Sequence, residues 1–544
     1  MKILPSTGTS LLALVLLASL VSRANSQDRF FNQTNFGDFA LPANWQGANP
    51  PSTGFANTFI GSSDLGSPTL VPVTAFLASD VSSWETGRLF LGQGGSGNAT
   101  LIISNGGSLQ YGEVYIGRDA AAIGVVNQSG GTNRVNTGTF EILSGSSGTG
   151  TYNLSGGVLN TVQAGAIAIK VGASGAGTGY FNMSGGTLNA GSDFATQQHS
   201  LNVGWESKGE ATFSGGTANI TGDLNAGNNG NGLVTISDSA TVNARNLNVG
   251  LQAGGANSRL TVSGGTVSVT NGIVVSNSSV LNMSGGTVSA TGLRIASGSI
   301  MNDSGGSLNL PSITNNGSIV YSNSSGTLTR SNAISGSGAV TKSGAGSVTL
   351  TANNTYTGDT TVNAGSLIIN GNQSSANGVL NVAAGATLGG SGTIGGATTI
   401  SGVLAPGNSI GTLAVANDVT WNGGENWVFE LGAAGPSIGS PGSSDLLAIS
   451  GGNDFLKGTG SSFTFDFAGT GDVGWYKLVD WAGGTTTFDV AEFSGVNLAS
   501  TYTSEFAIQD NALYVNVVPE PSTYALLAVA AAGFGAHVVR RRRR

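Results

Sequence analysis

Two short segments match the Gly-x-Ser-x-Gly pattern that surrounds the nucleophile of many serine hydrolases: GNSIG, starting at Gly407, and GPSIG, starting at Gly435. This chemistry needs a histidine to take the serine proton and a carboxylate to orient that histidine. The chain has two histidines, His199 in a QQHS segment and His537 near the carboxyl terminus, and neither has an identifiable carboxylate partner. A nucleophile of this kind also lies between a strand and a helix, and no helix is expected at either segment. We therefore predict that neither serine is a nucleophile.

Cleavage of acidic polysaccharides would instead need clustered aspartates together with lysine or arginine. The candidates are Arg118, Asp119, Asp193, Asp238 and Asp359. They are scattered, and no pair recurs at a constant spacing, so we interpret them as solvated loop charges. There is no cysteine, no His-x-x-x-His and no calcium-binding nonapeptide series. The sequence predicts no catalytic residue, no metal site and no cofactor, and hence not an enzyme.

The overall composition excludes one class of partner and indicates a class of fold. Charged residues make up 9% of the chain and the net charge is −8, whereas a nucleic-acid-binding protein needs a basic stripe. We therefore expect no nucleic acid partner. The mixture of Gly, Ser and Asn with Val, Ile, Leu and Thr predicts many short strands joined by tight turns, and thus an all-β chain.

A repeated Ser-Gly-Gly triplet organises the middle of the sequence. It occurs, with small variations, in segments that start at Ile102, Val126, Tyr152, Phe181, Ala211, Leu260, Leu281 and Met301. Between the triplets runs a second strand that ends in Val-Gly or Ile-Gly, with copies starting at Val114, Ile169, Leu201 and Leu247. Such units could form hairpins in an antiparallel sandwich or stacked coils in a parallel β-solenoid. Because the same residue types recur at the same place in each unit, we favour the solenoid.

The segment from Ser335 to Gly371 resembles the autotransporter-associated β-strand repeat. Its Lys-x-Gly-x-Gly strand, Asn-x-Tyr-x-Gly-x-Thr turn and Val-x-x-Gly-x-Leu strand begin at Lys342, Asn354 and Val362. The following VLAPGNSIGTLAV, from Val403, matches a Pro-Gly-Asn-Ser segment that accompanies this repeat. The resemblance implies a right-handed β-helix in an exported protein.

The two ends of the chain differ from the repeats. Lys2, an apolar stretch from Leu11 to Val21 and the small residues of SRANSQD fit a secretory signal peptide cleaved after Ala24 or Ser26. A short membrane anchor is the alternative. Past Trp421 the strands become longer and richer in aromatic residues, which suggests an antiparallel β module. The expected organisation is a signal peptide (1–26), an N-terminal capping β region (27–97), an SGG-repeat solenoid (98–330), the autotransporter-type repeat region (331–417), a C-terminal β module (418–517) and a terminal segment (518–544).

The terminal segment has three parts: Pro519-Glu520-Pro521, an apolar run from Tyr524 to Val539, and five arginines. The apolar run is just long enough for a transmembrane helix if flanking residues are included, and the arginines would hold its end in the cytoplasm. A plain tail anchor is the simpler interpretation. However, the order of the parts resembles the PEP-CTERM sorting signal, which implies recognition by an exosortase, a membrane cysteine transpeptidase. The sorting residues implied are Pro519, Glu520, Pro521, Arg540, Arg541, Arg542, Arg543 and Arg544.

We therefore expect an exported, non-enzymatic β-helix protein with a structural or adhesive role at the cell surface, in exopolysaccharide or in biofilm. Its expected partners are the Sec-type export machinery, the exosortase, the inner membrane before processing, and exopolysaccharide or other surface proteins. The alternative is a β-helix that binds or degrades polysaccharide.

Overall fold

The computed structural model describes residues 29–31, 36–38, 45, 57–62, 73–80, 86–94, 97–136, 138, 140–143, 147–161, 169–191, 199–469 and 471–520. The chain divides into two compact units, Met1–Thr291 and Gly292–Arg544. Both are all-β: among the described residues the helical elements are two short 3-10 turns, η3 (Ala253–Gly255) and η4 (Val490–Glu492).

The first unit is built from strands of 3 to 19 residues. They are β1 (Arg29–Phe31), β2 (Phe36–Asp38), β3 (Asn57–Ser62), β4 (Val73–Leu77), β5 (Thr86–Gln93), β6 (Asn98–Ile103), β7 (Ser108–Ile116), β8 (Ile123–Val135), β9 (Phe140–Ile142), β10 (Thr149–Asn160), β11 (Ile169–Val171), β12 (Thr178–Ala190), β13 (His199–Val203), β14 (Lys208–Ala226), β15 (Gly232–Ile236), β16 (Thr241–Val249), β17 (Arg259–Val269), β18 (Gly272–Val275) and β19 (Val280–Ser289).

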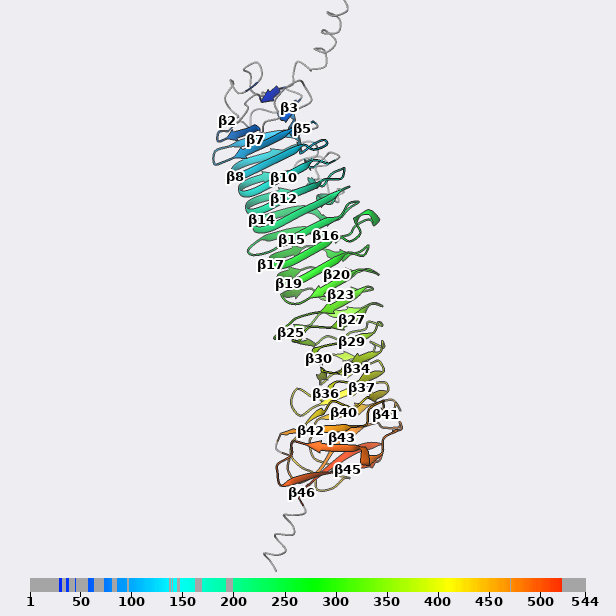
Figure 1. Ribbon diagram of the computed structural model, residues 1–544. Coiled ribbons are helices and arrows are strands. Elements are labelled where there is room, and N and C mark those ends of the chain that lie inside the picture. The colour runs from blue at the N-terminus through cyan, green and yellow to red at the C-terminus, as the bar shows by residue number, and fades with distance from the viewer. Residues whose placement is uncertain are drawn as a thin grey trace, which may run out of the picture. The chain divides into compact units, whose positions relative to one another are not determined.

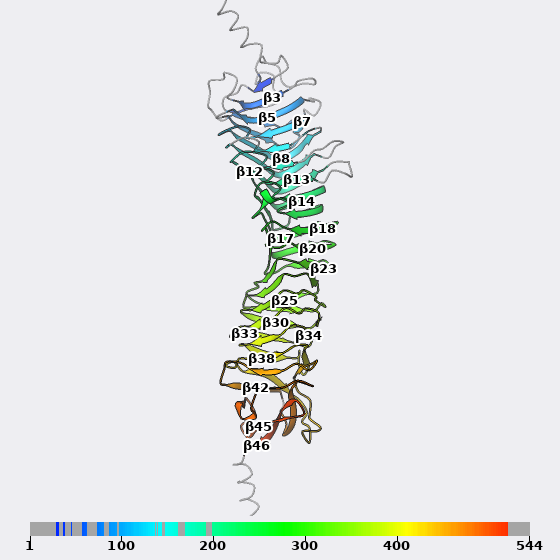
Figure 2. The ribbon, with the colours of Figure 1, turned by 90° about the vertical axis from the view of Figure 1, so that its right-hand side faces the viewer.

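These strands pair in parallel with the equivalent strand one repeat further along the chain. Tyr152 in β10 lies opposite Phe181 in β12, which lies opposite Ala211 in β14. All three side chains are buried, and their neighbours along each strand point outward. Figures 1 and 2 show these strands as successive rungs. The ladders are those of stacked coils, as the repeats predicted, and the hairpin alternative is excluded for these units.

The parallel pairing begins near the amino terminus, inside the region expected to be a cap. Strand β1 pairs in parallel with β3, and β3 pairs in parallel with β5. The expected cap therefore already contains stacked strands.

The Ser-Gly-Gly triplet forms a bend within a strand rather than a turn between two strands. Strands β10, β12 and β14 run through it, with an irregularity of register at the triplet. A Cβ atom added to Gly185, the first glycine, would lie 2.4 Å from the carbonyl oxygen of Ser155 in the preceding coil. Gly186, the second glycine, has φ +73°, a backbone angle that residues with a side chain rarely adopt. The first glycine thus allows coils to approach, and the second allows the chain to bend.

One polar cluster lies inside this unit. Gln128 occupies the inward position just before a Ser-Gly-Gly triplet, and its amide donates to the carbonyl of Val158 at 3.0 Å. The Tyr152 hydroxyl donates to the Gln128 amide oxygen at 2.5 Å and accepts from the amide of Asn133 at 3.0 Å. Burial raises the pKa of Tyr152, so the hydroxyl keeps its proton. The cluster remains tolerable in the core because its members bind each other.

The second unit contains shorter strands. They are β20 (Gly292–Ile295), β21 (Ile300–Asp303), β22 (Ser307–Asn309), β23 (Ser312–Asn315), β24 (Ser318–Tyr321), β25 (Thr327–Arg330), β26 (Ala333–Ser335), β27 (Ala339–Lys342), β28 (Ser347–Leu350), β29 (Thr360–Val362), β30 (Gly365–Ile369), β31 (Asn372–Gln373), β32 (Leu380–Val382), β33 (Ala386–Gly390), β34 (Thr393–Ile394), β35 (Thr398–Ile400), β36 (Val403–Pro406), β37 (Thr412–Val415), β38 (Val419–Trp421), β39 (Trp427–Leu431), β40 (Leu446–Ile449), β41 (Phe455–Lys457), β42 (Phe463–Gly469), β43 (Gly474–Asp480), β44 (Phe493–Val496), β45 (Tyr502–Gln509) and β46 (Ala512–Pro519).

The prediction of an antiparallel C-terminal module is wrong for most of residues 418–517. Strands β38 and β41, β39 and β42, and β42 and β44 all pair in parallel, so coils continue past Trp421. Their aromatic residues fill a wider interior: the rings of Trp421 and Trp427 are fully buried and stack at 3.8 Å. Among the described strands of this region, antiparallel pairing is made by β46, which lies between β43 and β45. The other antiparallel contacts are isolated bridges, such as that between Leu431 and Ser444. The alternation of aromatic and polar residues suggested hairpins, because it does not reveal which strand is the partner. In the structure the partner is the equivalent strand of the next coil.

A buried ion pair joins two coils at the start of this unit. Asp303 is fully buried and Arg330 is 5% exposed. The guanidinium donates to both carboxylate oxygens, at 2.7 Å from Nε and 2.6 Å from Nη2. A further bond from Nη1 reaches the carbonyl of Gly306 at 3.2 Å. Such a pair is costly to disrupt because removal of one partner leaves an uncompensated buried charge.

We predict that Gly185→Ala destabilises the first unit by about 1–3 kcal/mol, because the new Cβ would overlap the carbonyl of Ser155. Ser184→Ala, at the exposed neighbouring position, should change stability by about 0.5 kcal/mol or less. Urea denaturation of the full chain measures both. Equal effects of the two substitutions would contradict the close approach of coils at the first glycine.

Loss of the buried carboxylate in Asp303→Ala should destabilise the second unit by about 3–5 kcal/mol. The double variant Asp303→Leu, Arg330→Met should recover most of that loss, since no charge remains buried. Asp480→Ala is the matched control, because the Lys477–Asp480 pair is partly exposed and should contribute about 1 kcal/mol or less. A double variant no more stable than Asp303→Ala would argue against this account.

Candidate functional site

The last described element is a hairpin that leads directly into the predicted sorting residues. Strands β45 and β46 pair antiparallel through a two-residue turn, Asp510-Asn511, in which both residues have positive φ (50° and 57°). This is the backbone of a type I′ turn, whose twist matches that of paired strands and which favours Asp and Asn. The turn fixes the register of β46 up to its end at Pro519.

The structure holds the first two predicted sorting residues in this hairpin. Pro519 lies opposite Tyr502, and the backbone N–H of Glu520 donates to the carbonyl of Thr501 at 2.8 Å. Both are half-buried. Proline lacks the N–H that a ladder needs, which accounts for the end of β46 at this residue. Pro521 and the five arginines from Arg540 to Arg544 lie outside the described residues.

Both predicted membrane-directed segments, the signal peptide (1–26) and the apolar run (524–539), also lie outside the described residues. Across the described part of the chain, no helix is both long and apolar enough to span a membrane.

The residues of the autotransporter-type repeat act as internal braces of their coils. The buried ammonium of Lys342 donates to the carbonyl of Gly344 and, at 3.2 Å, to that of Ala364, and its burial lowers its pKa. The amide oxygen of Asn354, which is buried, accepts the backbone N–H of Ile334 at 2.8 Å. Both side chains therefore bind backbone groups: Lys342 binds two carbonyls just outside strands, and Asn354 binds an N–H within β26.

Tyr356, from the same repeat, is buried and its hydroxyl lies 2.7 Å from that of Thr360. Burial raises the pKa of this tyrosine, so it stays neutral. The contacts of Lys342, Asn354 and Tyr356 thus lie within one coil or between neighbouring coils.

Asp445 fastens the Pro-Gly-Asn-Ser segment, and the sequence did not single it out. Its carboxylate accepts the backbone N–H of Gly411 at 2.9 Å on one oxygen and that of Glu430 at 2.8 Å on the other. Burial is the main cause that raises its pKa to about 6, with a smaller contribution from the Glu430 charge. The two N–H donors act in the opposite direction. This carboxylate spans three segments of the second unit, but its partners are backbone groups.

The aspartates considered for catalysis have separate local roles. Asp119 accepts the N–H of Gly94 at 3.1 Å, Asp238 accepts the hydroxyl of Ser237 at 3.0 Å, and Asp359 accepts the N–H of Val379 at 3.0 Å. Arg118 lies over the rings of Phe90 and Tyr115, 5.1 Å from each centroid. Asp193 lies outside the described residues. These groups are not brought together, and no three metal-binding side chains cluster in the described part of the chain.

The two serine motifs also lack the context of a nucleophile. GNSIG connects β36 to β37, and GPSIG lies between β39 and β40, so each is followed by a strand rather than a helix. His199 lies in β13, its side chain is not described, and His537 lies outside the described residues.

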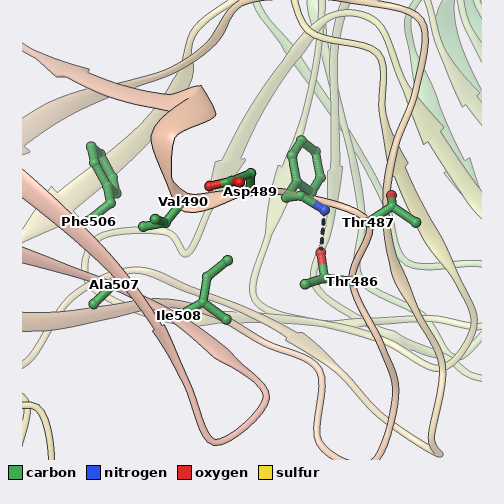
Figure 3. Close-up of a pocket in the computed structure, with 8 residues that line it drawn as sticks. Thr486, Thr487, Asp489, Val490, Phe506, Ala507 and Ile508 are labelled. Atoms are coloured by element: carbon green, nitrogen blue, oxygen red, sulfur yellow. Dashed lines mark hydrogen bonds between the residues drawn. The ribbon is translucent and has the colours of Figure 1, made fainter.

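An open pocket of about 730 Å³ lies between the end of β45 and residues 486–490 (Figure 3). Five of its eight lining residues are apolar, among them Val490 and Ile508, and the other three are Thr486, Thr487 and Asp489. Its carboxylate, from Asp489, accepts the N–H of Ala491 at 3.1 Å and caps η4, while Glu492 accepts the N–H of Asp489 at 3.0 Å. The acid is thus engaged in a capping box. We see no arrangement there for proton transfer.

Comparison with protein-family models identifies a known motif at the carboxyl end of the sequence. Residues 517–544 match the PEP-CTERM protein-sorting motif. The chain carries a PEP-CTERM sorting signal. Residues 340–369 match the passenger-associated-transport repeat, in the region of the autotransporter-type resemblance. Both resemblances noted in the sequence are confirmed, and the PEP-CTERM match covers all of the predicted sorting residues.

No curated protein matches the sequence. Among solved structures, the chain is similar to the Haemophilus influenzae Hap adhesin, at 11% identity and a TM-score of 0.26. The match covers 86% of this chain and 65% of the adhesin chain. A TM-score this low does not establish a shared fold.

We predict that stability falls as pH rises from about 4 to about 6 through Asp445. Its pKa in the folded chain is about 6, above the ordinary value of about 4, so the folded chain binds this proton more tightly. The resulting stabilisation is complete below the ordinary pKa and is lost as pH rises through 6. Asp445→Asn should flatten this part of the profile in calorimetric Tm measurements from pH 4 to 7. Glu505→Gln, which changes the same charge at an exposed position, should leave it intact. Identical profiles for Asp445→Asn and wild type would exclude this assignment.

Proposed function

We propose that this chain is an exported, non-enzymatic β-helix protein that an exosortase-type system sorts to the cell surface or extracellular matrix, where its role is structural or adhesive. The PEP-CTERM match at residues 517–544 is the observation that carries the proposal. The passenger-associated-transport repeat at residues 340–369 supports export. The parallel coils support a β-helix, which we propose is right-handed.

In this proposal residues 1–26 direct export, and the apolar run 524–539 holds the precursor in the inner membrane with Arg540–Arg544 in the cytoplasm. Pro519, Glu520 and Pro521 are recognised by the sorting enzyme. The hairpin supports this order, because β46 ends at Pro519, directly before the rest of the sorting signal. Residues 27–97, 98–330, 331–417 and 418–517 then form the exported body.

The contacts of the polar groups support a structural role. Lys342, Asp303 and Asp445 bind partners in their own coil or in a neighbouring one, and the aspartates considered for catalysis are dispersed. A stack of coils offers a long, repetitive exterior instead of one concave site, which suits contact with a surface or polymer. We therefore place exopolysaccharide or other surface proteins among the proposed partners.

We predict that Glu520→Ala, or replacement of Pro519, Glu520 and Pro521 by alanine, blocks removal of the tail in a host with an exosortase. Intact-mass measurement should show loss of the tail from wild type but not from these two variants, which should stay in the inner-membrane fraction. Glu505→Ala, on the exposed side of β45, is the matched control and should be processed normally. If wild type and all variants keep Arg540–Arg544 and remain in the inner membrane, the sorting proposal fails and a plain tail anchor replaces it.

A further inference from the structure

Past each Ser-Gly-Gly bend, the strand in the first unit presents two outward positions that stack from coil to coil. One column consists of Thr187, Thr217, Thr241, Thr266 and Thr287, each opposite the next. The second column consists of Asn160, Asn189, Asn219, Asn243, Ser268 and Ser289. We call these two columns the Thr/Asn face.

The Thr/Asn face is accessible and carries no charge. Its side chains are half-exposed or exposed, while the residues between them, such as Leu188 and Val242, are buried. The face before the bend differs, because its columns further from the bend contain Lys208, Glu210 and Arg259. Only its column next to the bend, which consists of Asn182, Thr212, Thr235, Thr261 and Asn282, is uncharged. The face after the bend is therefore uncharged in both of its columns, whereas the face before the bend is not.

Side-chain hydrogen bonds hold the amide column in a fixed orientation. The amide of Asn219 donates to the Asn189 oxygen at 3.0 Å, and that of Asn243 donates to the Asn219 oxygen at 3.0 Å. A primary amide has two N–H donors and an oxygen with two lone pairs, so a ladder uses only half of this capacity. Because these side chains are already ordered, their binding to a partner costs little further side-chain entropy.

We propose that the Thr/Asn face is a self-association surface whose partner is the same face on a second copy of this chain. Amides and hydroxyls both donate and accept, so a face made of them is complementary to itself, as a two-fold contact requires. The spacing of its groups is set by the coil spacing and is therefore identical in the two copies. A face of like charges would repel the same face on a second copy, whereas the uncharged Thr/Asn face has no such repulsion.

The size of the face indicates that one contact is weak and that many contacts together are needed for stable association. Six coils at ~4.8 Å and four residues at ~3.3 Å give a flat area of roughly 400 Å² per copy. Stable interfaces bury about 800 Å² per partner. Two molecules in solution would therefore pair weakly, and copies held side by side at a surface would gain from avidity. The surface setting rests on the proposed function, but the pairing itself does not.

The natural chain has no cysteine, so one introduced thiol can report the contact. Thr241→Cys places it at the centre of the Thr/Asn face, where a two-fold contact brings it near its own copy. Thr235→Cys is the matched control: the same substitution in the adjacent strand β15, half-exposed, on the outward side before the bend. Its column lies beside the one that contains Glu210 and Arg259, so this face carries charge. Both full-length variants are treated with a short bis-maleimide over a range of protein concentrations, and dimer is quantified by mass.

We expect cross-linked dimer to form about tenfold faster in Thr241→Cys than in Thr235→Cys, through the raised local concentration of its partner thiol. Adding Asn219→Lys to Thr241→Cys should remove the excess by charge repulsion, with an unchanged Tm as the check on folding. Tail-mediated association would raise both rates equally. Equal rates, or a faster Thr235→Cys, would overturn the proposal. One further result would overturn the proposal: no excess dimer, together with slower maleimide labelling of Thr241→Cys when crystalline cellulose is present. The face would then bind an ordered neutral polysaccharide. Failure here would leave the sorting test unaffected.

Discussion

The backbone ladder between successive coils is the interaction on which the other features of both units depend. Because each strand hydrogen-bonds in parallel to its counterpart one repeat later, every residue type is placed against its equivalent, and a side chain must be compatible with itself at the spacing of two strands. Glycine at Gly185 is required because the carbonyl of Ser155 lies where a side chain would begin. Inside, the rule selects apolar columns such as Tyr152, Phe181 and Ala211; outside, it selects amides that bond to one another.

This self-compatibility explains what the sequence could and could not predict. The Ser-Gly-Gly and Val-Gly repeats predicted stacked coils because both recur in register. The sequence did not identify Asp303 as part of an ion pair. It occupies the inward position before a triplet, where other copies have Leu154, Met183 or Phe213. A break in an apolar column was therefore the available signal, and Gln128 is a second example. Asp445 gave no such signal, because its partners are backbone groups that no sequence pattern records.

The carboxyl end shows where local sequence is informative and where tertiary pairing overrides it. The turn Asp510-Asn511 could have predicted the β45–β46 hairpin, because both residue types tolerate positive φ. The strands before it carry the same alternation of aromatic and polar residues, yet they pair in parallel one coil away. An alternating strand fits either arrangement, since it needs only one buried face. The difference lies in the connection between strands: a two-residue turn compels antiparallel pairing, and a long loop allows another coil.

The distribution of polar groups between interior and exterior connects this architecture to the proposed function. Two interior cations have their partners within the chain: Arg330 binds Asp303, and the ammonium of Lys342 donates to carbonyl oxygens. These groups are therefore engaged in joining coils and give no support to acid–base chemistry. On the exterior, equivalent groups recur at the coil spacing and do not converge on one point. A single small substrate would use few of them, whereas an extended or repeating partner can use many weak contacts at once. The same stacking rule that builds the interior thus favours, on the exterior, a partner that is itself repetitive.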